Sequence, residues 1–283
     1  MQKYSISSNF ASLDYLQAMS IMGKHGFHYA ELAFEHSQEF LQLGDPEKIG
    51  AEKAKYAQDQ GISVLQGHLL FPDADLADAN PERRQELLDG WKKELLLFEA
   101  MGIRNAVMHP GGFSAFAHGM TLEEVAEIRT DSLKQLAEFT RNMHVRVCLE
   151  NLSYGRYMSV AEDLVDAIER TGMDNLGIIL DTGHLNINGW LKQSQRDFIL
   201  KAGKYLHGLH LQDNHGKSDE HLFPLQGTIN FREVASTLKE IGYDDLCNLE
   251  VPGESWVVNS KYPELMEYKV EYARHLLETI FPD

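Results

Sequence analysis

Cysteine is scarce in this sequence, and its spacing excludes two common structural roles. Cys148 and Cys247 are the only cysteines among the 283 residues, and each lies inside an apolar stretch. A disulfide scaffold needs a much higher density of cysteine, and a zinc ribbon needs closely spaced pairs. We therefore expect both thiols to be reduced and buried in the hydrophobic core.

Basic residues and long apolar runs are scarce as well. The chain has 26 Lys and Arg against 43 Asp and Glu, which gives a formal net charge of −17. Such a charge repels nucleic acid and anionic membranes unless a local basic patch overrides it. No run approaches the roughly 18 apolar residues of a membrane span, and the opening MQKYSISSNF lacks the apolar core of a secretory signal. These absences favour a cytoplasmic protein whose partner is a small molecule rather than nucleic acid or a membrane, and they are compatible with a homo-oligomer.

The chain also lacks linkers and low-complexity segments that would divide it. Its one internal rhythm is a short apolar or alternating run, a polar loop, and then a helix-length amphipathic segment. The expected strands are KYSISS, HYAELA, ISVLQGH, RNAVMH, VRVCLE, LGIILD, YLHGLH and DLCNLE. The expected helices cover residues 13–25, 46–60, 82–101, 121–142, 158–172, 190–202, 230–241 and 262–279.

Eight strand–helix repeats predict an α/β fold, a single (β/α)8 TIM barrel domain over residues 1–283. A doubly wound sheet has the same alternation, but no glycine-rich turn follows the first strand here. In a barrel the active site lies where the strands end and the loops into the helices begin. Functional side chains are therefore expected at the strand ends.

Six consecutive strands end on a side chain that can bind a metal ion. These terminal residues are, in chain order, His68, His109, Glu150, Asp181, His210 and Glu250. Side chains alternate inward and outward along a barrel strand, so inward-pointing terminal residues converge at the mouth of the barrel. Crowded carboxylates repel one another unless a cation lies among them, and mixtures of His, Asp and Glu suit Zn²⁺, Mn²⁺ or Co²⁺. Any one of these residues could end its strand by chance, but six together predict a metal site.

The loop after the seventh strand reads HLQDNHGKSDEH and adds further candidates. Asp219 and His221 are two residues apart, so in an extended segment both point to the same side. They could share a second ion, as could His184, which comes three residues after Asp181. The other polar side chains of this loop are interpreted as solvated: Asp213, Asn214, His215 and Lys217.

Several motifs resemble the superfamily of xylose-isomerase-like TIM barrels, which holds sugar phosphate isomerases and epimerases together with endonuclease IV. The matching segments are CLENLS, ILDTGHLNI, LHLQDN, DEHLFPLQGTINF and NLEVPG, and the resemblance covers nearly the whole chain. In the sugar epimerase branch one divalent ion is bound by four residues, which correspond here to Glu150, Asp181, His210 and Glu250. In the endonuclease IV branch three zinc ions use these four and further ligands, which correspond to His68, His109, His184, Asp219 and His221.

Two loops at the expected mouth favour the sugar branch. An abasic-site endonuclease grips backbone phosphates and inserts side chains into the duplex, which requires Arg- and Lys-rich loops. Here the segments EHSQEFLQLGDPE and LLFPDADLADANPE are acidic and apolar. Aromatic walls for a compact ligand, or alternatively core residues, are expected in Phe71, Phe113, Trp190 and Trp256. The keto-sugar 3-epimerases carry an Arg shortly after the seventh-strand His, where this chain has Gly216 and Lys217.

The resemblance implies a divalent-metal-dependent isomerase or epimerase that acts on a small sugar, sugar phosphate or polyol derivative. Glu150 and Glu250 would transfer the proton through a metal-stabilised enediolate, and His184 would bind or polarise a substrate oxygen. The cofactor is expected to be Zn²⁺ or Mn²⁺, as one ion or more. Substrate contacts are expected from His68, His109, Lys217 and Trp256, and a phosphate could be held by Lys217, Arg156 or the backbone amides of HPGG.

Two other classes stay open at this point. An endonuclease IV-like trinuclear zinc phosphodiesterase acting on abasic DNA has the ligand inventory in its favour and the composition against it. A non-catalytic barrel with a structural ion is disfavoured, because structural sites are normally closed by four protein ligands with none left over.

Overall fold

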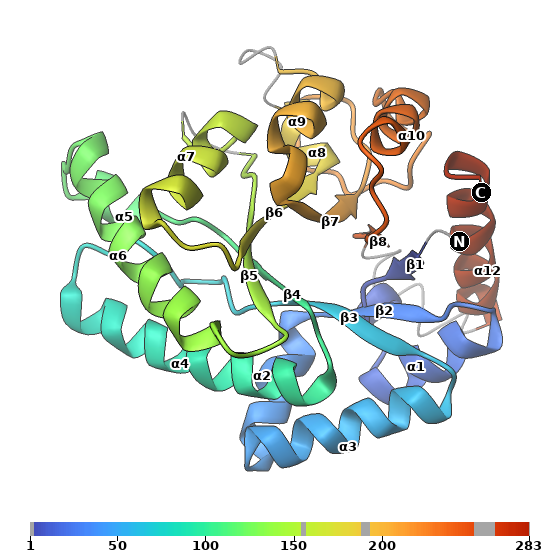
Figure 1. Ribbon diagram of the computed structural model, residues 1–283. Helices are drawn as coiled ribbons and strands as arrows, with labels where there is room; N and C mark the ends of the chain where they lie inside the picture. The colour runs from blue at the N-terminus through green and yellow to red at the C-terminus, as the bar shows by residue number, and fades with distance from the viewer. Residues whose placement is uncertain (1–2, 154–156, 188–192, 252–263, 283) are drawn as a thin grey trace.

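Eight parallel strands form one sheet that curls into a nearly closed barrel (Figure 1). The computed structural model describes residues 3–153, 157–187, 193–251 and 264–282. The strands are β1 (Lys3–Ile6), β2 (Tyr29–Leu32), β3 (Ser63–His68), β4 (Asn105–Met108), β5 (Arg146–Glu150), β6 (Leu176–Asp181), β7 (Leu206–Leu211) and β8 (Leu246–Leu249). Their order in the sheet is β1, β8, β7, β6, β5, β4, β3, β2. A parallel bridge between Ser7 and Glu31 joins the two edges.

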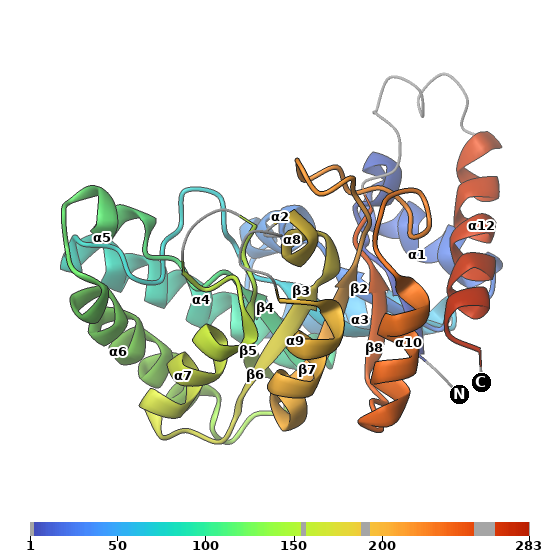
Figure 2. The same ribbon diagram turned by 90° about the horizontal axis from the view of Figure 1, so that it is seen from above.

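Most helices lie on the outer side of the barrel (Figures 1 and 2). They are α1 (Tyr15–Lys24), α2 (Phe34–Leu43), α3 (Pro46–Asp59), α4 (Pro81–Met101), α5 (Phe113–Ala117), α6 (Leu122–Thr140), α7 (Ala161–Thr171), α8 (Thr182–Ile187), α9 (Gln195–Ala202), α10 (Phe231–Glu240) and α12 (Glu264–Ile280). The predicted TIM barrel is confirmed, and the expected helices agree within a few residues, except that the one expected from residue 190 begins at Gln195. No helix in the described part of the chain is both long and apolar enough to cross a membrane.

Local sequence signals set the helix ends. Asn80 caps the start of α4 with its side chain, and Pro81 occupies the first turn. The helix ends at Gly102, whose φ of 81° is left-handed and costs glycine little. Thr121 and Glu124 form a capping box at the start of α6. Helices bounded in this way return the chain to the same side of the barrel, so successive strands end at one rim.

The two cysteines lie in the core. Cys148 and Cys247 are both buried and outside any disulfide, so the prediction of two reduced core thiols is confirmed. Cys148 forms a small apolar cluster with Val107 and Ile179.

One predicted loop is a helix. The segment EHSQEFLQLGDPE is expected to be an acidic and apolar loop, but most of it belongs to α2. His36, Ser37 and Phe40 are buried there, and the Ser37 hydroxyl donates to Glu94 of α4. The expectation is wrong because the burial that stabilises this helix comes from α3 and α4, which contact it from elsewhere in the chain. The short helices α5 and α8 also lie in loops for which no helix is expected.

Glu94 is a buried carboxylate that should make folding depend on pH. Its side chain accepts hydrogen bonds from Ser37, Gln38 and the Leu70 amide. Burial nevertheless raises its pKa from 4.5 to about 7. Because the folded pKa lies above the unfolded value, its contribution to stability is complete below the unfolded pKa and is lost as the pH rises through the folded pKa. Between these two pKa values the free energy of unfolding should fall by about 3 kcal/mol. Urea unfolding should show a flatter pH dependence for Glu94→Gln across this range, and identical profiles would contradict the expectation.

Gly208 keeps space inside the barrel for a polar side chain. A Cβ at this position would lie 2.3 Å from Gln66 Oε1 and 2.5 Å from Ile179 Cδ1. Gly208→Ala is therefore expected to lower the free energy of unfolding by about 1–3 kcal/mol through overpacking. Gly90 of α4 is the matched control, because a Cβ there meets no atom within 4 Å. Gly90→Ala should stabilise the protein by about 0.5–1 kcal/mol. Urea unfolding measures both changes, and a neutral Gly208→Ala would be inconsistent with this packing.

Candidate metal centre

Three groups of His, Asp and Glu side chains converge at the carboxyl ends of the strands. In each group the candidate ligand atoms lie within 4.8 Å of one another. The His68 group is His68, His109 and Glu150; the central group is Glu150, Asp181, His210 and Glu250; the His184 group is His184, Asp219 and His221. The structure thus brings together all nine residues that the sequence marks as candidate ligands.

The central group combines side chains from four neighbouring strands. Glu150 and Asp181 end β5 and β6, His210 lies in β7, and Glu250 directly follows β8. His210 Nδ1 lies 2.8 Å from Glu150 Oε1 and 3.4 Å from Glu250 Oε2. The side chains of Glu150, Asp181 and His210 are fully buried, whereas that of Glu250 is partly exposed. Two carboxylates therefore face one ring nitrogen in a largely dry environment.

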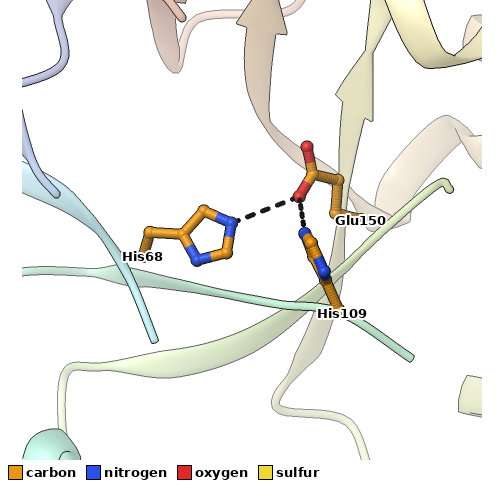
Figure 3. Close-up of side chains that lie close together, drawn as sticks. All are labelled: His68, His109 and Glu150. Atoms are coloured by element: carbon orange, nitrogen blue, oxygen red, sulfur yellow. Dashed lines mark ion pairs between the residues drawn. The ribbon is translucent and has the colours of Figure 1, made fainter. Parts of the chain in front are cut away.

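Glu150 also belongs to the His68 group (Figure 3). Its Oε2 lies 3.1 Å from His109 Nε2 and 3.4 Å from His68 Nε2, and both rings point at it in Figure 3. Its other oxygen, Oε1, faces His210. His68 ends β3 and His109 directly follows β4, so the rings approach from neighbouring strands. One carboxylate therefore links two candidate ion positions, one through each oxygen.

The loop after β7 completes the His184 group. His184 Nε2 lies 3.1 Å from Asp219 Oδ2, and His221 Nε2 lies 3.2 Å from the same oxygen. An antiparallel bridge between Asp213 and Leu222 folds the loop back on itself. That fold brings two loop residues to α8, which carries His184.

Hydrogen bonds to backbone carbonyls orient three of the histidine rings. Nδ1 of His68 donates to the carbonyl of the next residue over 2.8 Å. Nδ1 of His184 donates to the Asn151 carbonyl over 2.9 Å, and Nδ1 of His221 to the Glu250 carbonyl over 3.0 Å. A carbonyl only accepts, so Nδ1 carries the hydrogen, and Nε2 of a neutral ring offers its lone pair to the group. Metal-binding histidines adopt this arrangement.

Unpaired carboxylate oxygens indicate what the groups can bind. Among the described residues, neither Glu150 Oε2 nor Glu250 Oε2 accepts a hydrogen bond of normal geometry, although both atoms are buried. Burial, together with the charge of Glu150, raises the pKa of Glu250 to about 8. Buried oxygens without partners are costly, and a divalent cation stabilises them by accepting their lone pairs. The donor set therefore fits an ion such as Zn²⁺ or Mn²⁺.

His184 shows that ion binding should be linked to proton release. Burial lowers the pKa of this ring, but the carboxylates of Asp181, Asp219 and Glu150 raise it by a larger amount. The net pKa therefore lies well above the usual value. An ion that takes the lone pair of this ring must displace the proton. Binding at the His184 group is therefore expected to weaken as the pH falls.

Phe71 forms an aromatic wall beside the His68 group. Its ring centroid lies 4.9 Å from that of His68, 4.6 Å from His109 and 4.7 Å from Phe34. This is where the apolar face of a compact ligand would pack. Phe113, expected to form a second wall or part of the core, is 56% exposed at the start of α5, so it is not a core residue. Three further expected contacts lie outside the described residues: Arg156, Trp190 and Trp256.

Two amides of the glycine turn after β4 are bound by a carboxylate of the chain. The amides of Gly112 and Ser114 donate to the Asp75 carboxylate over 2.6 and 2.8 Å, and Arg129 donates to two carbonyls of the same turn. The Gly112 amide is therefore not available to a phosphate, because a carboxylate of the chain already accepts its hydrogen bond, and phosphate binding by the rest of HPGG stays a prediction.

The polar loop after β7 is less solvated than expected. Asp213 and Asn214 are buried, and the Asp213 carboxylate accepts hydrogen bonds from the backbone amides of residues 227 and 229. Their interpretation as solvated side chains is wrong, because they bind the returning end of the loop. His215 and Lys217 are exposed as expected. A substrate contact by Lys217 stays a prediction.

Two side chains that contact the groups escape the sequence patterns. Glu31 Oε2 lies 2.7 Å from His210 Nε2. The Gln212 amide donates to Asp219 Oδ1 over 2.7 Å and to Asp181 Oδ1 over 3.3 Å. The available signal for Glu31 is an acidic residue within the otherwise apolar strand β2, since a carboxylate is rarely buried without a partner. Nothing comparable marks Gln212.

Relatives of this chain include sugar isomerases and epimerases. An inosose isomerase of Bacillus velezensis is 22% identical over 83% of this chain and 82% of its own length. A D-psicose 3-epimerase of Enterocloster bolteae is 24% identical over 70% of this chain and 65% of its own length. A probable endonuclease 4 of Mesomycoplasma hyopneumoniae is 30% identical over 59% of this chain and 61% of its own length.

Solved structures share the fold. A D-psicose 3-epimerase crystallised in the presence of D-fructose has a TM-score of 0.81 at 17% identity, with both chains covered to 100%. The IOLI protein with a zinc atom has a TM-score of 0.75 at 21% identity, covering 99% of this chain and 98% of its own. The family model for the xylose isomerase-like TIM barrel matches residues 21–276, which is most of the sequence, and the chain therefore belongs to this family.

Proposed function

We propose that this protein is a divalent-metal-dependent isomerase or epimerase acting on a small sugar, sugar phosphate or polyol derivative. The observation that carries the proposal is the pair of carboxylates in the central group: Glu150 Oε1 and Glu250 Oε2 lie 2.8 and 3.4 Å from the same atom, His210 Nδ1. Acid–base groups around one candidate ion position suit proton transfer beside a carbonyl. The named isomerase and epimerase relatives support the reaction class.

The central group would hold the ion. When bound, a divalent ion polarises a carbonyl and acidifies the neighbouring C–H bond. The backbone amide of His184 donates to Asp181 Oδ1 over 2.6 Å and so fixes this carboxylate before any ligand arrives. The burial of the group limits water and strengthens each electrostatic contact.

Glu150 and Glu250 would divide the proton transfer between them. One carboxylate removes the proton from the carbon beside the carbonyl, and the other returns a proton. Return to the same carbon from the opposite face gives an epimer, and return to the adjacent carbon gives an isomer. The His184 ring, whose Nδ1 lies 3.8 Å from Glu150 Oε1, would contact a substrate oxygen. His68 and His109, next to Phe71, would bind the rest of the sugar.

Solvent hydrogen exchange tests the proposal before the product is known. Protein loaded with Zn²⁺ or Mn²⁺ is incubated in D2O with a panel of ketoses, aldoses, polyol ketones and their phosphates. We expect deuterium at the carbon beside the carbonyl of at least one compound, and loss of that exchange when a chelator removes the ion. Asp181→Asn, which weakens the central group without removing Glu150 or Glu250, should behave like chelated protein. A panel without any metal-dependent exchange would contradict the proposal.

A trinuclear zinc phosphodiesterase is the second candidate. The observation in its favour is that two further groups flank the central one, with Glu150 shared between two of them. The formal charge of −17 opposes binding of a polyanion. Zinc-loaded protein should therefore be assayed on abasic-site duplex at low salt, where phosphate contacts are strongest. Efficient zinc-dependent nicking without sugar exchange would favour this candidate over the first.

A further inference from the structure

His210 is held differently from the other oriented histidines of the site. Its Nε2 lies 2.7 Å from Oε2 of Glu31, and its Nδ1 is turned toward Glu150 and Glu250. Three other rings bond in the opposite sense, through Nδ1 to backbone carbonyls: His68, His184 and His221. His210 and Glu31 are 0% and 2% exposed, so water does not compete for the contact.

Glu31 is itself fixed by a chain of hydrogen bonds between neighbouring strands. The Ser5 hydroxyl donates to Asn248 Oδ1 over 2.7 Å, and the Asn248 amide donates to Ser7 Oγ over 3.1 Å. The Ser7 hydroxyl then donates to Glu31 Oε1 over 2.6 Å. The Gln66 amide donates to the second oxygen, Oε2. Every member of the chain is buried.

The direction of these bonds decides where the hydrogen of His210 lies. Ser7 has a single hydroxyl hydrogen, and its oxygen already accepts from Asn248, so the hydrogen points to Glu31. Glu31 thus receives a donor on each oxygen and, as a carboxylate, has no hydrogen to give. Its contact with His210 requires the hydrogen on Nε2. Nδ1 lies 2.8 Å from Oε1 of Glu150, a second carboxylate, so an ion that takes the place of the hydrogen on Nδ1 receives the lone pair of that nitrogen, while Nε2 keeps its hydrogen for Glu31.

We propose that Glu31 is a positioning residue for metal binding, which fixes the ring orientation and the tautomer of His210 so that Nδ1 can bind the ion of the central group. The inference rests on the metal-dependent function proposed above, but it concerns ion binding rather than turnover. Partners of metal-binding histidines typically contribute about 10–100-fold to metal affinity. Glu31→Gln should therefore weaken zinc binding by about this factor.

Competition with a chromophoric zinc chelator measures the dissociation constants. A glutamine at position 31 has nearly the same size, but its amide cannot accept hydrogen bonds from both Ser7 and His210. Glu94→Gln is the matched control. Glu94 is 1% exposed and accepts three hydrogen bonds, none of which comes from a side chain of the three groups. Glu94 interacts electrostatically with His68, which lies outside the central group, so its substitution should leave the zinc affinity of the central group at the wild-type value.

The ¹⁵N chemical shifts of the imidazole rings in zinc-loaded protein provide a readout that a general loss of stability would not move. In the wild type, His210 should carry its hydrogen on Nε2, whereas the rings of His68, His184 and His221 should carry it on Nδ1. Wild-type zinc affinity in Glu31→Gln, an equal loss in Glu94→Gln, or a hydrogen on Nδ1 of His210 would each overturn the role of Glu31 and leave the proposed function standing. Wild-type protein that binds no zinc would overturn both.

Discussion

Glu250→Gln is expected to lower the rate of proton exchange on the substrate by a factor on the order of 10²–10⁴, with a much smaller change in substrate affinity. The glutamine keeps an oxygen that can face the ion, but it cannot accept the proton that leaves carbon. Glu250 suits that step because its Oε2 faces His210 Nδ1 at 3.4 Å and has no hydrogen-bond partner among the described residues. Deuterium incorporation at saturating metal measures the rate.

The matched control for this substitution is Glu220→Gln. Glu220 is an exposed glutamate of the loop after β7 and pairs with His215 rather than with the site. The Glu220→Gln variant should catalyse proton exchange on the substrate at the wild-type rate. The metal content of each variant is measured alongside, because a variant that has lost its ion is slow for a different reason. An unchanged rate in metal-loaded Glu250→Gln would assign the base to another residue.

The strands could be predicted from sequence because their own residues carry the signal. LGIILD, for example, is buried at every position of β6, and a continuous apolar run is typical of a strand covered on both faces. The helices within the loops could not be predicted in this way. α8 has only six residues, too few to show a helical period, and α2 is stabilised by contacts with α3 and α4 rather than by its composition.

The convergence of the strand-end side chains follows from the barrel itself, because its parallel strands end at one rim. The surroundings of those side chains do not follow from it. Glu31 contacts His210, which is 179 residues away, and no local pattern connects a glutamate of β2 with a histidine of β7. Asp213 lies in a polar segment and is nevertheless buried, because amides of residues 227 and 229 fold back onto it. Local composition does not reveal which donors the fold brings to a side chain.

Glu150→Gln is expected to abolish ion binding at one of the two groups that share this carboxylate. Glu150 Oε2 faces His68 and His109 at 3.4 and 3.1 Å, and Oε1 faces His210 at 2.8 Å. A glutamine keeps only one oxygen, so its NH2 group must point at one of the two ion positions, where it cannot act as a ligand. Zinc per chain, measured by elemental analysis after dialysis against buffered zinc, should therefore fall by at least one ion relative to the wild type.

The loss of bound zinc in Glu150→Gln should also reduce the stabilisation of the protein by zinc, measured as the rise in Tm. An ion that binds only the folded chain, at about 1,000 times its dissociation constant, stabilises by about 4 kcal/mol, which corresponds to a rise in Tm on the order of 10 °C. Zinc should raise the Tm of wild-type protein by this order and that of Glu150→Gln by less. Asp219→Asn is the matched comparison, because Asp219 belongs to the His184 group alone and its loss should leave the ions at Glu150 in place. If zinc content and the zinc-dependent Tm are both unchanged in Glu150→Gln, this carboxylate does not hold the ions, and the metal-dependent function loses its structural basis.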